Sequence, residues 1–118
     1  MKPISSSVPV LLKVGQDELH RLLGDQGKRV LRQVHQFIKK VAVNHHWPLE
    51  RIEVRYYRDP EVKGWEYVIV DLVLTCSFDQ AEQYLLEFCD FLDAQSSHWN
   101  EQDQNILHEK IYFDVKAI

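Results

Sequence analysis

Two alternating stretches in the middle of the chain constrain the fold more than any other feature. In residues 52–57 apolar side chains alternate with polar or amphipathic ones, and residues 65–76 continue the alternation over a greater length. A period of two is typical of a strand that buries one face. Between them, residues 59–64 contain Asp59-Pro60 and Lys63-Gly64, which favour a turn. We therefore predict an antiparallel hairpin.

The longer stretch predicts two unlike faces for this hairpin. On one side it carries aliphatic side chains and a cysteine, namely Val68, Val70, Leu72, Leu74 and Cys76. On the other side it carries aromatic, polar and aliphatic side chains, namely Trp65, Tyr67, Ile69, Asp71, Val73 and Thr75. We expect the first set to face a hydrophobic core.

Helical patterns lie on both sides of the hairpin. Residues 25–44 bring their apolar side chains onto one arc, with Asp25 as a candidate N-cap and Pro48 beyond the end. Residues 17–23 predict a short preceding helix that ends at Gly24. A second amphipathic helix is expected from Asp79, whose D-x-x-E spacing favours a helix start, to the break at Ser96-Ser97.

The two ends of the chain complete the predicted order. Residues 1–7 are expected to be a frayed leader, and residues 8–14 a short strand that Pro9 confines to an edge or to its own start. Residues 98–105 predict a loop or a helical turn, and residues 106–115 a final strand. We therefore expect one α+β domain over 1–118: a ferredoxin-like β-α-β-β-α-β two-layer sandwich, with helices on one face of an antiparallel sheet. If residues 8–14 form no strand, we expect a three-stranded sheet with two or three helices on one side.

Motifs of catalysis and metal binding are missing from the sequence. The six histidines have no ligand spacing, and the four glycines are too dispersed to form a phosphate-binding loop. Cys76 and Cys89 lie on apolar faces, where burial makes a thiol inert. The carboxylates of the second helix form a polar face that we expect to be solvated. We therefore predict a protein that is not an enzyme and that needs no cofactor or metal.

Two further expectations follow from composition. No stretch approaches the ~20 apolar residues of a membrane span, and the N-terminus lacks the long apolar run of a secretory signal. With two isolated cysteines, this favours a cytoplasmic protein. Charge is unevenly distributed, because residues 1–63 sum to +5 and residues 64–118 to −9. Such polarity favours association with a charged partner or a second copy, unless the helices neutralise each other within one molecule.

One segment of the hairpin resembles a known motif. The octapeptide Lys63-Gly64-Trp65-Glu66-Tyr67-Val68-Ile69-Val70 is similar to the RNP1 sequence of RNA-recognition motifs, although Glu66 and Val70 depart from its pattern. The resemblance implies that Trp65 and Tyr67 stack on bases while Lys63 and Arg55 contact phosphates. Binding of RNA or single-stranded nucleic acid is therefore the alternative function.

The main hypothesis concerns the sheet face that the helices leave uncovered. Such a face would be apolar and aromatic with few lysines, which is typical of the centre of a protein interface. We expect contacts from Arg55, Tyr57, Trp65, Tyr67, Ile69 and Val73. A homodimer is the simplest interpretation, and binding of a different protein is the other form of this hypothesis. Residues 1–24 could instead cover this face, and a small-ligand sensor with a cleft between sheet and helices is a third possibility.

Overall fold

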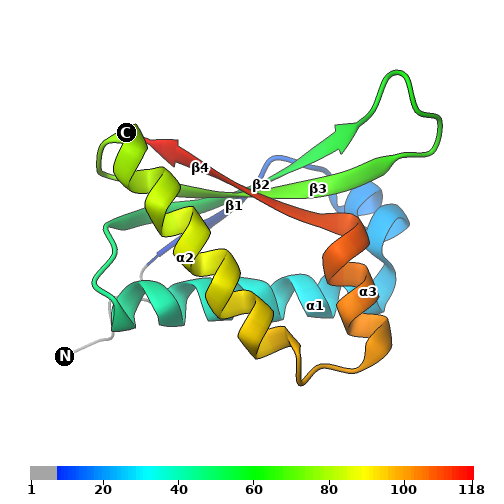
Figure 1. The fold of residues 1–118 in the computed structure, drawn as a ribbon. Helices are drawn as coiled ribbons and strands as arrows, with labels where there is room; N and C mark the ends of the chain where they lie inside the picture. The colour runs from blue at the N-terminus through cyan, green and yellow to red at the C-terminus, as the bar shows by residue number, and fades with distance from the viewer. Residues whose placement is uncertain (1–7) are drawn as a thin grey trace.

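The computed structural model describes residues 8–118, which form four strands and three helices. The strands are β1 (Val10–Leu12), β2 (Leu49–Arg58), β3 (Glu66–Leu74) and β4 (Ile111–Ala117). The helices are α1 (Gln16–Asn44), α2 (Phe78–Ser96) and α3 (Glu101–Lys110). All three helices lie on one side of the sheet, so the chain makes two layers and leaves the other side of the sheet uncovered (Figure 1). The expected leader, residues 1–7, lies outside the described residues.

The sheet has the strand order β1-β2-β3-β4, so each strand pairs with its neighbours in the sequence. Strands β2 and β3 form the predicted antiparallel hairpin, in which Tyr57 lies opposite Tyr67. The outer pairs are parallel, because α1 connects β1 to β2 while α2 and α3 connect β3 to β4. Parallel neighbours need such a crossover, whereas antiparallel ones can be joined by a short loop.

The predicted ferredoxin-like antiparallel sheet is therefore wrong. A split βαβ unit has another strand between its two parallel strands. Here the two strands of each unit are hydrogen-bonded directly, with Val10 beside Ile52 and Val68 beside Ile111. The order of elements along the chain fits both arrangements, and alternation identifies a strand without identifying its partner. The three-residue β1 lies at an edge of the sheet and begins directly after Pro9, which agrees with both positions that the proline allows.

Helix α1 contains a sharp break where the sequence predicts two helices. Gly24 has φ 69° and ψ −175°, a left-handed conformation that glycine adopts without steric cost. Across the break, Leu23 packs closely against Gly27: a Cβ on Gly27 would lie 2.7 Å from the Cβ of Leu23. The N-cap of α1 is Gly15, while the Asp25 carboxylate lies 3.6 Å from His20.

The later helices differ from the prediction at their ends. The N-cap of α2 is Ser77, whose hydroxyl accepts a bond from the backbone N–H of Gln80, so the helix begins before Asp79. Residues 101–110 form α3, in place of the expected loop and the start of the expected last strand. Asn100 caps α3 by accepting the N–H of Asp103 at 2.8 Å. Strand β4 therefore begins at Ile111.

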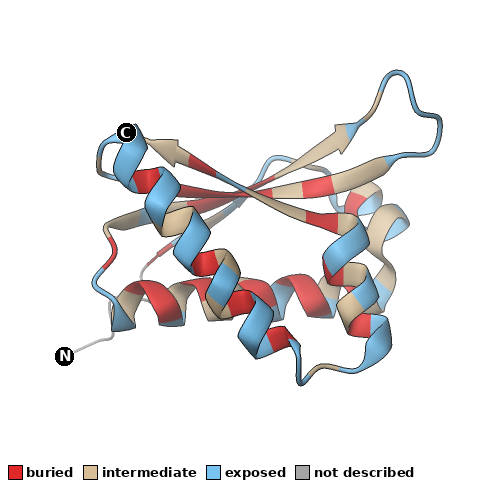
Figure 2. Ribbon diagram, in the orientation of Figure 1, coloured by how far each residue is buried: buried red, intermediate tan, exposed pale blue. Residues whose placement is uncertain are grey.

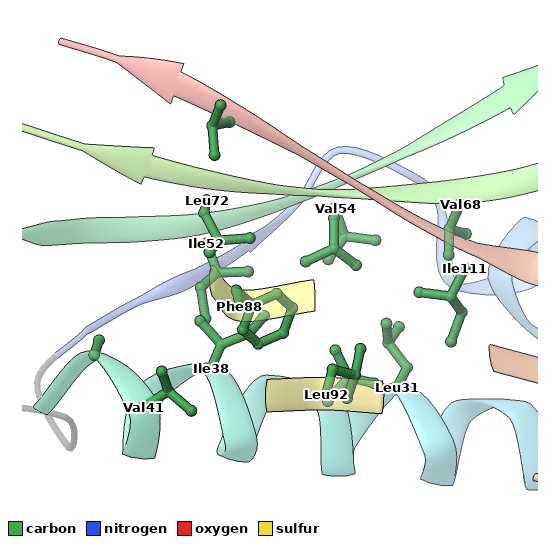
Figure 3. Packing of buried hydrophobic residues seen from close by; sticks show 14 of the residues in the cluster. Leu31, Ile38, Val41, Ile52, Val54, Val68, Leu72, Phe88, Leu92 and Ile111 are labelled. Carbon is green, nitrogen blue, oxygen red and sulfur yellow. The ribbon is translucent and has the colours of Figure 1, made fainter. Parts of the chain in front are cut away.

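The hydrophobic core lies between the sheet and the helices. Val68, Val70, Leu72 and Leu74 of β3 are fully buried there, as their alternation predicts, whereas Cys76 is half-buried (Figure 2). Phe88 of α2 belongs to the same hydrophobic cluster, in which Figure 3 labels Val68, Leu72 and Phe88. Exposed positions follow the outer sides of the helices, which gives each helix one buried stripe. Within the described part of the chain, no helix has both the length and the apolar character that crossing a bilayer requires.

Candidate functional site

The uncovered face of the sheet carries its side chains in rows that run across β2, β3 and β4. One row consists of the acidic residues Glu53, Asp71 and Asp114. The row on one side of it consists of Arg51, Val73 and Lys116, and the row on the other side of Arg55, Ile69 and Tyr112. Beyond these, Tyr57 and Tyr67 lie opposite each other near the hairpin loop. The face therefore has a charged part and an aromatic part.

Glu53 is the centre of the charged part. Its side chain is almost completely buried, with 2% of its surface exposed, and it is surrounded by three cations. Lys116 and Lys13 place their Nζ atoms 2.8 and 3.0 Å from Oε1. Arg51 donates from Nε to Oε2 at 2.7 Å. These hydrogen bonds, with that of Lys116 the strongest, lower the pKa of Glu53 from the usual 4.5 to about 2.

Asp71 on the neighbouring strand has a similar environment. It has no exposed surface, and the guanidinium of Arg55 donates to its two oxygens, from Nε at 2.8 Å and from Nη2 at 3.4 Å. This two-point pairing raises the pKa of Arg55. Lys116 lies 3.8 Å from the same carboxylate and so connects Asp71 to Glu53. We call Glu53, Asp71 and their four cations, Lys13, Arg51, Arg55 and Lys116, the ion cluster.

The ion cluster changes what the uncovered face offers to a partner. Val73, flanked by Arg51 and Lys116, is fully buried, so it has no surface left for an intermolecular contact. Arg55 is already paired with Asp71 and lies 3.6 Å from Asp114, so it is not a free phosphate ligand. The charged part of the face thus satisfies its own polar groups, as buried charges require.

The aromatic part lies at the hairpin end of the face. We call it the aromatic patch, and it consists of Tyr57, Trp65, Tyr67 and Tyr112. Tyr67 is central: its ring centroid lies 5.0 Å from that of Tyr57, 5.7 Å from that of Trp65 and 4.2 Å from that of Tyr112. Such tilted and edge-to-face pairs are favourable geometries. Burial also raises the pKa of Tyr67.

The most accessible apolar side chains of this region lie on the hairpin loop. Trp65, just before β3, is 43% exposed, and Val62 is 50% exposed. The loop projects away from the helical layer (Figure 1). Gly64 has a left-handed φ of 81°, and the Asp59 carboxylate accepts two backbone N–H groups, those of Glu61 and Val62. Together with the backbone bonds of Trp65 to Asp59 and Val62, these local bonds fix the loop without using the Trp65 side chain.

The structure brings together some of the residues predicted for the site and separates others. Tyr57, Trp65 and Tyr67 form one cluster, Ile69 lies half-buried beside Arg55 and Tyr112, and Lys63 is exposed on the loop. Sequence reasoning missed Tyr112 as a member. The alternation of Tyr112 with Ile111 and Phe113 could have placed it on the uncovered face. Its contact with Tyr67 could not be predicted, because that contact depends on the register between β3 and β4.

Other reactive groups do not converge into a site. Within residues 8–118, no three His, Cys, Asp or Glu side chains are grouped in a way that could hold a metal ion. Cys76 and Cys89 are free and half-buried, and burial raises the pKa of the Cys89 thiol. A higher pKa reduces the thiolate fraction and hence the nucleophilicity at neutral pH.

Comparisons with protein-family models, with curated proteins and with solved structures found no match to this chain.

Proposed function

We propose that this protein is a non-catalytic binding module, and that the aromatic patch with the hairpin loop is its contact surface for a second copy of the chain. The observation that carries the proposal is a four-ring cluster on an uncovered sheet face, continuous with the exposed Trp65 and Val62 of a projecting loop. Large aromatic side chains with exposed apolar neighbours are enriched where protein interfaces have their strongest contacts.

A second copy fits this surface because a two-fold axis brings the same patch of two molecules together. An apolar, aromatic patch is complementary to itself, whereas a strongly charged one is not. The charges of the adjacent ion cluster are paired within the chain, so they need no charged groups from the second copy. The proposed contact therefore consists of Tyr57, Trp65, Tyr67, Ile69 and Tyr112, with Val62 at its rim.

Sedimentation analysis of two matched variants tests this proposal. Both variants are measured at about 0.5 M NaCl, where contacts between exposed charges are screened. In Trp65→Glu, a charge replaces the most exposed ring of the patch, and we expect the dimer to become a monomer. Phe78→Glu is the control, because Phe78 is comparably exposed at 57% but lies at the start of α2, away from the patch. We expect this control to remain a dimer. A monomeric wild-type protein, or equal dimers in both variants, would reject the proposal.

A second candidate is stacking of single-stranded nucleic acid on the same rings. Tyr112 favours this second candidate, because it adds an aromatic side chain from β4 next to Tyr67 of the RNP1-like segment. Base stacking needs ring faces, however, and these rings pack largely against one another. Titration with oligonucleotides at low salt, read by tryptophan fluorescence, distinguishes the two: quenching that Trp65→Phe removes would favour nucleic acid over a second copy.

A further inference from the structure

The outer surfaces of the two long helices carry opposite charge. In α1, residues 26–44 contain five cations and no acid: Lys28, Arg29, Arg32, Lys39 and Lys40. In α2 there are five acids and no Lys or Arg: Asp79, Glu82, Glu87, Asp90 and Asp93. The acids of α2 are all exposed, and so are Arg29, Arg32 and Lys40 of α1. The polarity seen in the sequence is therefore displayed at the surface.

These charges form no direct ion pairs with each other among the described residues. Among the described residues, no salt bridge joins a cation of α1 residues 26–44 to an acid of α2. The two helices nevertheless belong to one layer, since the ring of Phe37 in α1 lies 5.9 Å from the ring of Phe88 in α2. Their apolar stripes meet inside, and their charged sides face away from the core.

We propose that the helical layer is a second interaction surface, and that its partner is the helical layer of another copy, with α1 of each copy against α2 of the other. A two-fold axis makes one positive and one negative strip of each molecule meet their complements simultaneously. The equal and opposite charges of the strips argue for a second copy, because one chain supplies both halves. The helices lie on one side of the sheet (Figure 1), and the aromatic patch belongs to the other side.

Salt separates this inference from the proposed function. Contacts between exposed charges are screened at high ionic strength, whereas an apolar contact is not weakened by screening. The experiment therefore uses a chain that carries Trp65→Glu, so that only the helical layer is tested. We expect light scattering to show dimers at about 50 mM NaCl, with a dissociation constant at least about tenfold weaker at about 0.5 M NaCl.

Charge reversal identifies the strips that make the contact. One variant reverses Arg29, Arg32 and Lys40 to Glu, and a second reverses Glu82, Glu87 and Asp90 to Lys. All six positions are exposed, so circular dichroism is expected to show both variants folded. Each variant alone should be monomeric at low salt, because its strips then carry like charge.

Mixing supplies the decisive result. An equimolar mixture of the two variants should form a heterodimer, since each strip again meets an opposite one. A chain that carries all six reversals keeps the net charge of the starting chain, which is −5 because Trp65→Glu adds one acid to the −4 of the natural sequence, and it should dimerise with itself. If the starting chain is monomeric at low salt, or if the mixture stays monomeric, the inference is overturned. Neither outcome bears on the aromatic patch, whose variants are measured at high salt.

Discussion

The two parts of the uncovered sheet face differ in how they satisfy their side chains. The ion cluster pairs its buried carboxylates with cations of the same chain, so it is complete without a partner. The aromatic patch packs its rings on one another but continues into exposed Trp65 and Val62. We therefore expect the charged part to contribute to folding stability, and we propose the aromatic part for association. Substitutions in each part should therefore affect different measurements.

The largest effect on stability is expected from Asp71→Ala. Removing this fully buried carboxylate leaves the Arg55 guanidinium without its two-point partner. Because Arg55 is partly exposed, water can form some of the lost hydrogen bonds. We expect the free energy of unfolding, measured with urea, to fall by about 1–3 kcal/mol. The matched control is Asp114→Ala, whose carboxylate is exposed, and its effect should stay within about 0.5 kcal/mol. Equal effects for both would contradict the role given to the ion cluster.

A pH-dependent effect on stability is expected from Glu53→Gln. Because folding lowers the pKa of Glu53 from 4.5 to about 2, the charged carboxylate stabilises the folded state fully above pH 4.5. This contribution is lost as the pH falls from 4.5 toward 2, where the group becomes protonated in both states. The stability difference between wild type and Glu53→Gln should therefore be constant from pH 7 to 5 and shrink below pH 4.5. Urea unfolding at a series of pH values measures it, and a difference that persists unchanged to pH 2.5 would refute the assignment.

The smallest effect on stability is expected in the aromatic patch. The Trp65 ring is 43% exposed and contacts Tyr67, so Trp65→Ser removes less buried surface than the loss of a core tryptophan would, and the backbone bonds of Trp65 to Asp59 and Val62 remain. We expect the free energy of unfolding to change by no more than about 0.5–1 kcal/mol. Urea unfolding should be done at a concentration where the protein is monomeric, because association would otherwise add to the apparent stability. A loss above that of Asp71→Ala would reverse the comparison.

Local pattern explains which elements could be predicted from the sequence. Alternation located the β2–β3 hairpin and its buried face, and apolar arcs located α1 and α2. Helix α3 was missed because its sequence is mostly polar, and its start depends on the Asn100 cap. The sheet order was missed because alternation does not specify neighbours. Pro9 did not decide the order either, because it directly precedes β1, and a proline is tolerated at the start of an inner or an edge strand.

The candidate site was predictable only in part, for the same reason. Tyr57 and Tyr67 lie in one hairpin, so their contact follows from local pairing. The approach of Lys116 to Glu53 joins β4 to β2 across β3, over a separation of 63 residues, and no local pattern contains it. The sequence therefore indicated an apolar face, whereas the structure divides that face into a self-paired charged part and an aromatic part.

Hydroxyl-radical footprinting at low and high protein concentration tests the central proposal most directly, because it reports the solvent access of individual side chains. At about 0.5 M NaCl, where screening suppresses contacts between exposed charges, we expect oxidation of Trp65 to fall as concentration rises, while oxidation of exposed Phe78 stays constant. Equal oxidation of Trp65 at both concentrations would contradict the assignment of the aromatic patch as the interface.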